Sequence, residues 1–179
     1  MALKSTIHKA ELTVSDLDRH HYETYALTLA RHPSETSERM MVRMLAFALH
    51  ADERLEFGKG LSTDDEPALW QKSLCGEIER WIEVGLPDER ILRRACGRAR
   101  EVVLVAYGGR TVDIWWDANR TACERLGNLR VIEVPQETSA ALGQMAEKNM
   151  SLTATIQDAH MLMASDAATV AVDCATLKA

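Results

Sequence analysis

The chain has 179 residues, of which 46% are hydrophobic, and its 21 basic and 27 acidic residues give a formal net charge of −6. A chain of this length buries one sizeable core, so we expect a single domain over residues 1–179. The negative charge excludes strong sequence-independent attraction to nucleic-acid phosphates unless arginines gather on a local basic face.

Hydropathy and cysteine spacing limit the class of protein further. No apolar run is long enough to cross a bilayer, and charged residues interrupt the N-terminal segment where a signal peptide needs an apolar core. We therefore expect a cytoplasmic protein that makes no contact with a membrane. The cysteines are far apart and have no closely spaced histidine, a pattern that favours free thiols over a zinc site.

The N-terminal part of the chain predicts a β-hairpin and then a helix. Polar and apolar residues alternate over about the first thirty positions, as in paired strands. A helix is predicted over about residues 34–51, with Ser34 as its N-cap. Arg39 and Arg43 lie on a narrow polar strip of this helix, and apolar residues fill nearly all the rest. Glu38 falls on the apolar side, so we expect its carboxylate to point toward the interior.

Three short segments rich in β-forming residues follow the first helix. They are RLEFGKGL, TDDEPALWQKSL and GEIERWIEVG, and Gly, Asp and Pro separate them, which predicts a three-stranded meander. In the third segment the period of two places Trp81, Glu83 and Gly85 on one face. The carboxylate of Glu83 is therefore either held there by a cation or exposed to water on an edge strand.

A second helix, from about Pro87, has its arginines on one arc of about half the circumference. They are Arg90, Arg93, Arg94, Arg98 and Arg100. This arc is the local basic face that nucleic-acid binding would need. The apolar run VVLVAYG then predicts a central strand covered on both faces.

The remaining sequence predicts a helix, a strand, a short helix and two or three C-terminal strands. The helix is TVDIWWDANRTACERL, the strand is LRVIEVP, and the short helix runs from about Gln136 to Lys148. The whole order predicts an α/β (α+β) fold, in which a mixed β-sheet has helices on both faces. N- and C-terminal β-hairpin strands are expected in addition to that core.

The candidates for chemistry are acidic residues in or near the meander: Glu38, Asp64, Asp65 and Glu83. Carboxylates that converge repel one another unless they bind a cation or become protonated. A divalent ion such as Mg²⁺ or Mn²⁺ is the simpler answer. Such an ion polarises a phosphoryl oxygen and activates water, which is the chemistry that phosphodiester hydrolysis requires.

Three segments carry a family resemblance: TLARHPSETSERMMVRMLAFALHADERLEFGKGL, DDEP and WIEVGLPDER. They closely resemble the YaeQ family of small bacterial proteins, and the similarity covers essentially the whole chain. That family is similar in fold to the PD-(D/E)XK nuclease superfamily, which implies a restriction-endonuclease-like core with a metal site. The resemblance implies Glu38, Asp65 and Glu83 as metal ligands, with Asp64 as a further candidate. Asp65 and Glu83 would then also be the catalytic acids.

The superfamily pattern places a lysine two residues after its strand acid, and this chain has Gly85 there. Gln71 or Lys72, on the neighbouring strand, is the candidate replacement. Only one of the two can point toward the site, because successive residues of a strand face opposite sides. Lys72 would supply positive charge, whereas Gln71 would supply only an amide.

We expect a metal-dependent phosphodiesterase or nuclease that acts on nucleic acid as a monomer. The nucleic-acid contacts would come from arginines of the two helices, namely Arg39, Arg43, Arg90, Arg94 and Arg98. The alternative is a catalytically inactive module with a nuclease fold that binds nucleic acid or a protein partner. The glycine at position 85 favours this alternative.

Each candidate residue also has a purely structural interpretation. Glu83 would form a salt bridge with an arginine, and Glu38 would stabilise the N-terminus of its helix. Asp64 and Asp65 would form an acidic turn. The arginine arc would be a solvated helix face that pairs with acids at i and i+4.

Overall fold

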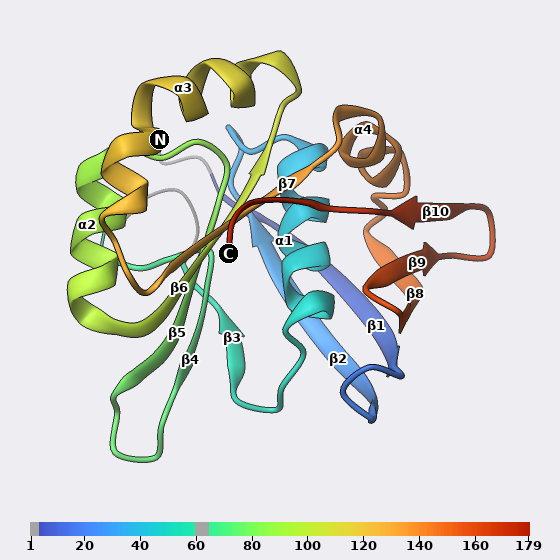
Figure 1. Cartoon of the computed structure of the whole chain (residues 1–179). Coiled ribbons are helices and arrows are strands. Elements are labelled where there is room, and N and C mark those ends of the chain that lie inside the picture. The colour runs from blue at the N-terminus through green and yellow to red at the C-terminus, as the bar shows by residue number, and fades with distance from the viewer. Residues whose placement is uncertain (1–3, 60–64) are drawn as a thin grey trace. The chain divides into compact units, whose positions relative to one another are not determined.

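The computed structural model describes residues 4–59 and 65–179, which form four helices and eleven strands (Figure 1). The chain divides into two compact units. Unit 1 comprises residues 1–51 and 137–173, and unit 2 comprises residues 52–136 and 174–179. Each unit has its own β-sheet, and the single domain over the whole chain stays a prediction. Among the described residues, no helix is both long and apolar enough to span a bilayer.

Unit 1 contains a five-stranded sheet with the order β10-β9-β8-β1-β2. Its strands are β1 (Thr6–Asp16), β2 (His21–Arg31), β8 (Asn149–Gln157), β9 (His160–Ala164) and β10 (Thr169–Val172). β1 runs parallel to β8, and the other pairs are antiparallel. The predicted N-terminal hairpin is confirmed. However, it forms a separate sheet with most of the C-terminal strands, because β1 and β8 pair along the length of β8.

The helices of unit 1 are α1 (Ser37–Leu49) and nearly all of α4 (Gln136–Gln144). The prediction of a buried helix is confirmed, since every residue of α1 from Met40 to Ala48 is buried. The predicted N-cap is wrong. Thr36 is the cap, and its side chain accepts the N–H of Arg39, whereas Ser34 bonds to His32 in the turn before the helix.

The turn between β8 and β9 contains two non-glycine residues in the left-handed region, Asp158 (φ 53°) and Ala159 (φ 64°). A two-residue hairpin turn with positive φ at both positions is of type I′ and favours glycine at the second. We expect Ala159→Gly to raise the free energy of unfolding by about 0.5–1 kcal/mol, because relief of strain exceeds the added chain entropy. Denaturant titration measures this. Ala171→Gly, on exposed and extended β10, should be destabilising; equal effects would contradict the explanation.

Unit 2 contains a six-stranded sheet with the order β11-β7-β6-β5-β4-β3. Its strands are β3 (Leu55–Phe57), β4 (Leu69–Lys72), β5 (Ile78–Val84), β6 (Ala99–Tyr107), β7 (Leu129–Val134) and β11 (Ala175–Lys178). β5, β6 and β7 are parallel, and the other pairs are antiparallel. The predicted meander and central strand are both confirmed, because β6 lies mid-sheet and is buried from Val102 to Ala106.

The helices α2 (Glu89–Arg98) and α3 (Arg110–Glu124) share a hydrophobic core with one face of this sheet. That core includes Trp81 of β5 and Leu92 of α2. The described residues therefore form a mixed α+β protein with two mixed sheets, where we expected one. The helix that we expected to open a restriction-endonuclease-like core, α1, belongs to unit 1, and the elements after it belong to unit 2. That core therefore stays a prediction.

Candidate functional site

The predicted metal ligands are divided between the two units. Glu38 lies in the first turn of α1 in unit 1, whereas Asp65 and Glu83 belong to unit 2. Asp64 lies outside the described residues. In the described part of the chain, no group of three or more histidine, cysteine, aspartate or glutamate side chains is arranged to hold a metal ion. A Mg²⁺ or Mn²⁺ site among these residues would therefore have fewer than three such protein ligands.

Glu38 has a structural partner within unit 1. The hydroxyl of buried Ser139, on α4, donates to Oε1 of Glu38 at 2.5 Å. Gly143 of α4 lies against the same residue, and a Cβ added there would be 3.1 Å from Cα of Glu38. The half-buried carboxylate thus ties α4 to the first turn of α1, where a negative charge also suits the helix dipole.

Glu83 lies beside Trp81 on β5, as the strand period predicts. The indole Nε1–H of Trp81 donates to Oε1 of Glu83 at 2.8 Å, and the Trp81 ring is buried. The guanidinium of Arg98, from α2, lies 5.1 Å from the centre of that ring. Trp70 of β4 packs edge-on against the same ring, with centroids 6.0 Å apart. The Glu83 carboxylate is thus oriented by an aromatic residue that is itself fixed on several sides.

Asp65 is connected to this group through α2. Its carbonyl accepts a hydrogen bond from Nη1 of Arg98 at 3.1 Å, and its carboxylate lies 3.8 Å from Nη1 of Arg94. The carboxylate is 85% exposed. A chain of contacts therefore runs from Asp65 through Arg98 and Trp81 to Glu83. The link uses the backbone carbonyl of Asp65 and the buried ring of Trp81, so it connects the two residues through Arg98 without joining their carboxylates.

The arginines of α2 are exposed, and Arg90, Arg93 and Arg94 each lie near an acidic side chain. Arg90 lies 3.3 Å from Asp88, the N-cap of α2, and the Arg90 backbone and side-chain hydrogen bonds hold the pKa of Asp88 below its usual value. Arg93 pairs with Glu89 one turn earlier. A surface hollow of about 340 Å³ is lined by Asp88, Arg90, Ile91 and Arg94. The arc is thus an exposed helix face that carries ion pairs, with a hollow beside its first arginines.

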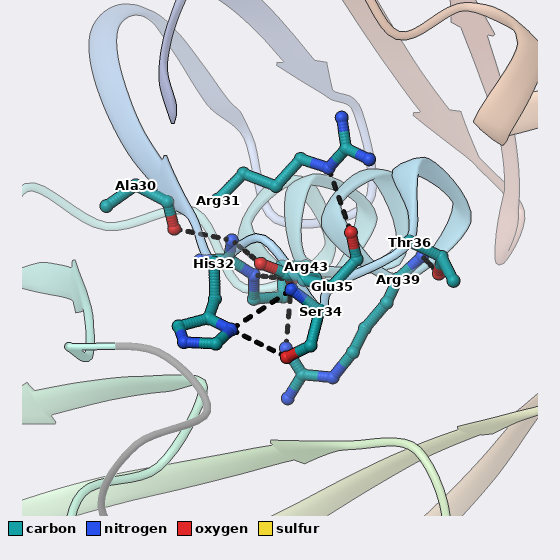
Figure 2. Close-up of polar contacts among 8 residues, drawn as sticks. All are labelled: Ala30, Arg31, His32, Ser34, Glu35, Thr36, Arg39 and Arg43. Carbon is teal, nitrogen blue, oxygen red and sulfur yellow. Dashed lines mark hydrogen bonds and ion pairs between the residues drawn. The ribbon is translucent and has the colours of Figure 1, made fainter. Parts of the chain in front are cut away.

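Arg39 and Arg43 are different, because they converge on Glu35 just before α1 (Figure 2). Nε and Nη2 of Arg43 donate to the two Glu35 oxygens, each at 2.8 Å, and Nη1 of Arg39 donates to Oε1 at 2.9 Å. The Arg43 side chain is 1% exposed and that of Glu35 is 0% exposed. Burial lowers the pKa of Arg43, and Glu35 opposes that shift. The prediction that Arg43 contacts nucleic acid is thereby corrected, since its guanidinium has no free surface.

The strand register separates the two candidate replacements for the missing lysine. Gln71 pairs with Arg80, whereas Trp70 pairs with Trp81, so Gln71 lies on the face of the sheet opposite Trp81 and Glu83. The prediction of Gln71 as a catalytic residue is corrected for this reason. Lys72 shares the Trp70 face, and its Nζ lies 3.7 Å from the centre of the Trp70 ring. Lys72 remains the candidate cation.

The glycine in the lysine position has a backbone reason. Gly85 has a φ of 108°, and its N–H donates to the carbonyl of Val105 on β6 at 3.0 Å. L-amino acids rarely adopt this backbone conformation. The end of β5 is therefore built for glycine, so a lysine side chain at this position would require a strained backbone.

The structure thus defines a mixed α+β protein in which unit 2 brings an arginine-rich helix next to two acidic residues. The chain belongs to the YaeQ protein family, whose sequence profile matches residues 1–174. The predicted resemblance to that family is confirmed. Membership of the wider nuclease superfamily is not shown by this match.

Relatives in curated sequences and solved structures cover nearly all of the chain. The YaeQ protein of Escherichia coli (strain K12) is 48% identical over 166 residues, which are 93% of this chain and 92% of that protein. The Salmonella typhi protein is 50% identical over 158 residues, covering 88% and 87%. Both are described as uncharacterized.

Two crystal structures are similar in fold as well. The YaeQ protein from Xanthomonas axonopodis pv. citri matches with a TM-score of 0.94 and 47% identity, covering 98% of this chain and 99% of that one. The YaeQ protein from Pseudomonas syringae matches with a TM-score of 0.94 and 39% identity, covering 98% and 97%.

Proposed function

We propose that this chain is a cytoplasmic nucleic-acid-binding module that uses the exposed arginine face of α2. The observation that carries the proposal is the row of Arg90, Arg94 and Arg98, at i, i+4 and i+8, beside the hollow at the start of the helix. The Cα atoms of these arginines are about 6 Å apart along the helix axis and lie on one side of it. The row gives an acidic protein the local basic surface that phosphate binding needs.

The acidic neighbours of these arginines do not prevent phosphate binding. Exposed ion pairs contribute only about 0–1 kcal/mol and are screened by salt, so a nucleic-acid phosphate can displace the carboxylate. The side chain of Arg90 is 85% exposed and that of Arg94 is 45% exposed. Arg43, in contrast, is held by a buried pair. The difference in burial separates arginines that can bind a ligand from one that supports the fold.

We expect Arg90→Gln combined with Arg94→Gln to weaken nucleic-acid binding about tenfold or more, because two phosphate contacts are lost. The slope of log affinity against log salt should fall by roughly 1–2. Fluorescence anisotropy with labelled single- and double-stranded oligonucleotides measures both quantities. Arg120→Gln on α3 is the matched control, since Arg120 is also exposed and paired with an acid, Glu124. Equal losses in control and variant would contradict an α2 site.

A second candidate, phosphodiester hydrolysis, is favoured by the contacts that link Asp65 to Glu83. It would correspond to the PD-(D/E)XK-like core that the family resemblance implies. Two carboxylates suit Mg²⁺ or Mn²⁺, which are often held by one or two acids together with water and phosphate oxygens. Such an ion supplies Lewis-acid and water-activating chemistry. In this chain Asp65 and Glu83 would hold the ion, Arg94 and Arg98 would orient the phosphate, and Lys72 would be the candidate cation on the Glu83 face.

Glu83→Gln is expected to abolish Mn²⁺-dependent cleavage of labelled oligonucleotides and to leave nucleic-acid affinity nearly unchanged, because the arginine row is intact. Ion binding has its own readout. The indole of Trp81 donates to Glu83, so Mn²⁺ should change tryptophan emission in the wild type but not in Glu83→Gln or Trp81→Phe. The absence of any calorimetric or fluorescence response at millimolar ion would exclude the metal-dependent candidate. It would not affect the proposal of a nucleic-acid-binding module.

A further inference from the structure

β2 is the edge strand of the unit 1 sheet, and apart from a hydrogen bond from Arg43 to the carbonyl of Ala30 it lacks the usual protection of an edge. It is eleven residues long and, among the described residues, pairs only with β1. The β1–β2 register continues from one end to the other without a bulge. Its sequence, HYETYALTLAR, contains no lysine, proline or glycine. Proteins commonly shield edge strands with lysine, proline, bulges or short length, because an open edge pairs with another strand.

The side chains of β2 leave room for such pairing. Tyr22, Glu23 and Thr24 are consecutive and all exposed, so both faces of the strand are open at its N-terminal half. Farther along, Ala26 and Thr28 are exposed on the outer face. Both side chains are small, and that of Ala26 is apolar. Small side chains on the outer face leave room for a strand that pairs with the edge of β2.

We propose that β2 pairs antiparallel with β2 of a second copy of this chain, around a two-fold axis at Leu27. In this register Glu23 lies opposite Arg31 of the second copy, and the symmetry repeats the pair. Tyr25 lies opposite Leu29 of the second copy. Opposite charges and aromatic–aliphatic pairs at directly opposed positions each stabilise a sheet by about 0.2–1 kcal/mol. The dimer would join two five-stranded sheets into one continuous sheet.

The charged residues of β2 favour this register over the register centred on Ala26. If the axis lay at Ala26, Glu23 would face Leu29 and Arg31 would face His21, so neither charge would lie opposite a residue of opposite charge. A two-fold axis normal to the sheet keeps each side chain on its own face, so it allows only those changes of pairing register that preserve the faces. The two registers therefore differ in both charged pairs, and only the one centred on Leu27 satisfies them. The proposed dimer differs from the expectation of a monomer, and the oligomeric state decides between them.

The test uses sedimentation equilibrium with two charge-reversed chains. Glu23→Lys alone and Arg31→Glu alone should each dimerise about tenfold or more weakly than wild type, because each converts two attractive pairs into two repulsive ones. An equimolar mixture of the two variants should recover the dimer, since both cross-pairs become attractive again. Recovery on mixing cannot arise from a defect in the fold of either variant.

A crosslink provides a second route if Arg31→Glu fails to fold, as Nε of Arg31 also donates to the carbonyl of Glu35. Leu27 would face itself across the axis at a Cα separation suited to a disulfide, about 4.5–5.5 Å. In a Cys75→Ser background, Leu27→Cys should crosslink with oxidised glutathione, and Leu162→Cys, exposed on β9, should not. Two results would overturn the proposal: a wild-type chain that stays monomeric at high protein concentration, or equal crosslinking at both positions. The same results would be expected if the true partner of β2 were an extended peptide.

Discussion

Glu35→Ala is expected to lower the free energy of unfolding by about 3–5 kcal/mol. Glu35 is the common acceptor for Arg39 and Arg43, and its removal leaves the buried Arg43 guanidinium without its charged partner. Nη2 of Arg43 also donates to the carbonyl of Ala30, at 3.2 Å. A neutral carbonyl cannot replace a carboxylate beside a desolvated positive charge. Chemical denaturation followed by circular dichroism measures the loss.

Two controls separate this buried pair from ordinary charge loss. Glu124→Ala removes an exposed carboxylate from a pair with Arg120 and should change stability by less than about 0.5 kcal/mol. In an Arg43→Met background, Glu35→Ala should cost at least about 1 kcal/mol less than in the wild type, because no buried charge remains. Additive effects of the two substitutions would show that Glu35 acts through the turn and not through the ion pair.

Local periodicity predicted the elements well but not their arrangement into two sheets. The hairpin, the meander and the central strand each follow from alternation or from an unbroken apolar run within one segment. The parallel pairing of β1 with β8 joins Lys9 to Asn149, and no local pattern in either strand specifies that partner. The N-cap of α1 was misplaced by two residues because Ser34 and Thr36 are both good caps.

The candidate site was predictable where it depended on one strand. The period of two placed Glu83 beside Trp81, and the structure shows the hydrogen bond between them. The choice between Gln71 and Lys72 depended on how β4 aligns with β5, where the register shifts between those two residues. The i, i+4 and i+8 spacing of Glu35, Arg39 and Arg43 could have indicated that their side chains interact. That spacing alone does not reveal that the turn is buried.

The second prediction with a large expected effect concerns Gly85, two residues after Glu83. We expect Gly85→Lys, which would restore the superfamily pattern, to destabilise the protein by about 1–3 kcal/mol. The reason is backbone strain, since Gly85 has a φ of 108° and an added Cβ would meet no atom within 4 Å. Gly85→Ala should therefore cost about as much as Gly85→Lys. Thermal and denaturant unfolding of both variants measure the change.

The matched control is Gly97→Ala, because Gly97 lies in α2 and a Cβ added there also meets nothing within 4 Å. It should stabilise the protein by about 0.5–1 kcal/mol, since alanine favours the helix. The two glycines thus differ in backbone conformation and not in available space. If Gly85→Lys were as stable as the wild type and gained Mn²⁺-dependent cleavage, strain would not explain the glycine, and this chain would be a nuclease lacking only its lysine. If Gly85→Lys destabilised the protein and gained no cleavage activity, the result would instead support a binding role, with a backbone at position 85 that does not accommodate lysine.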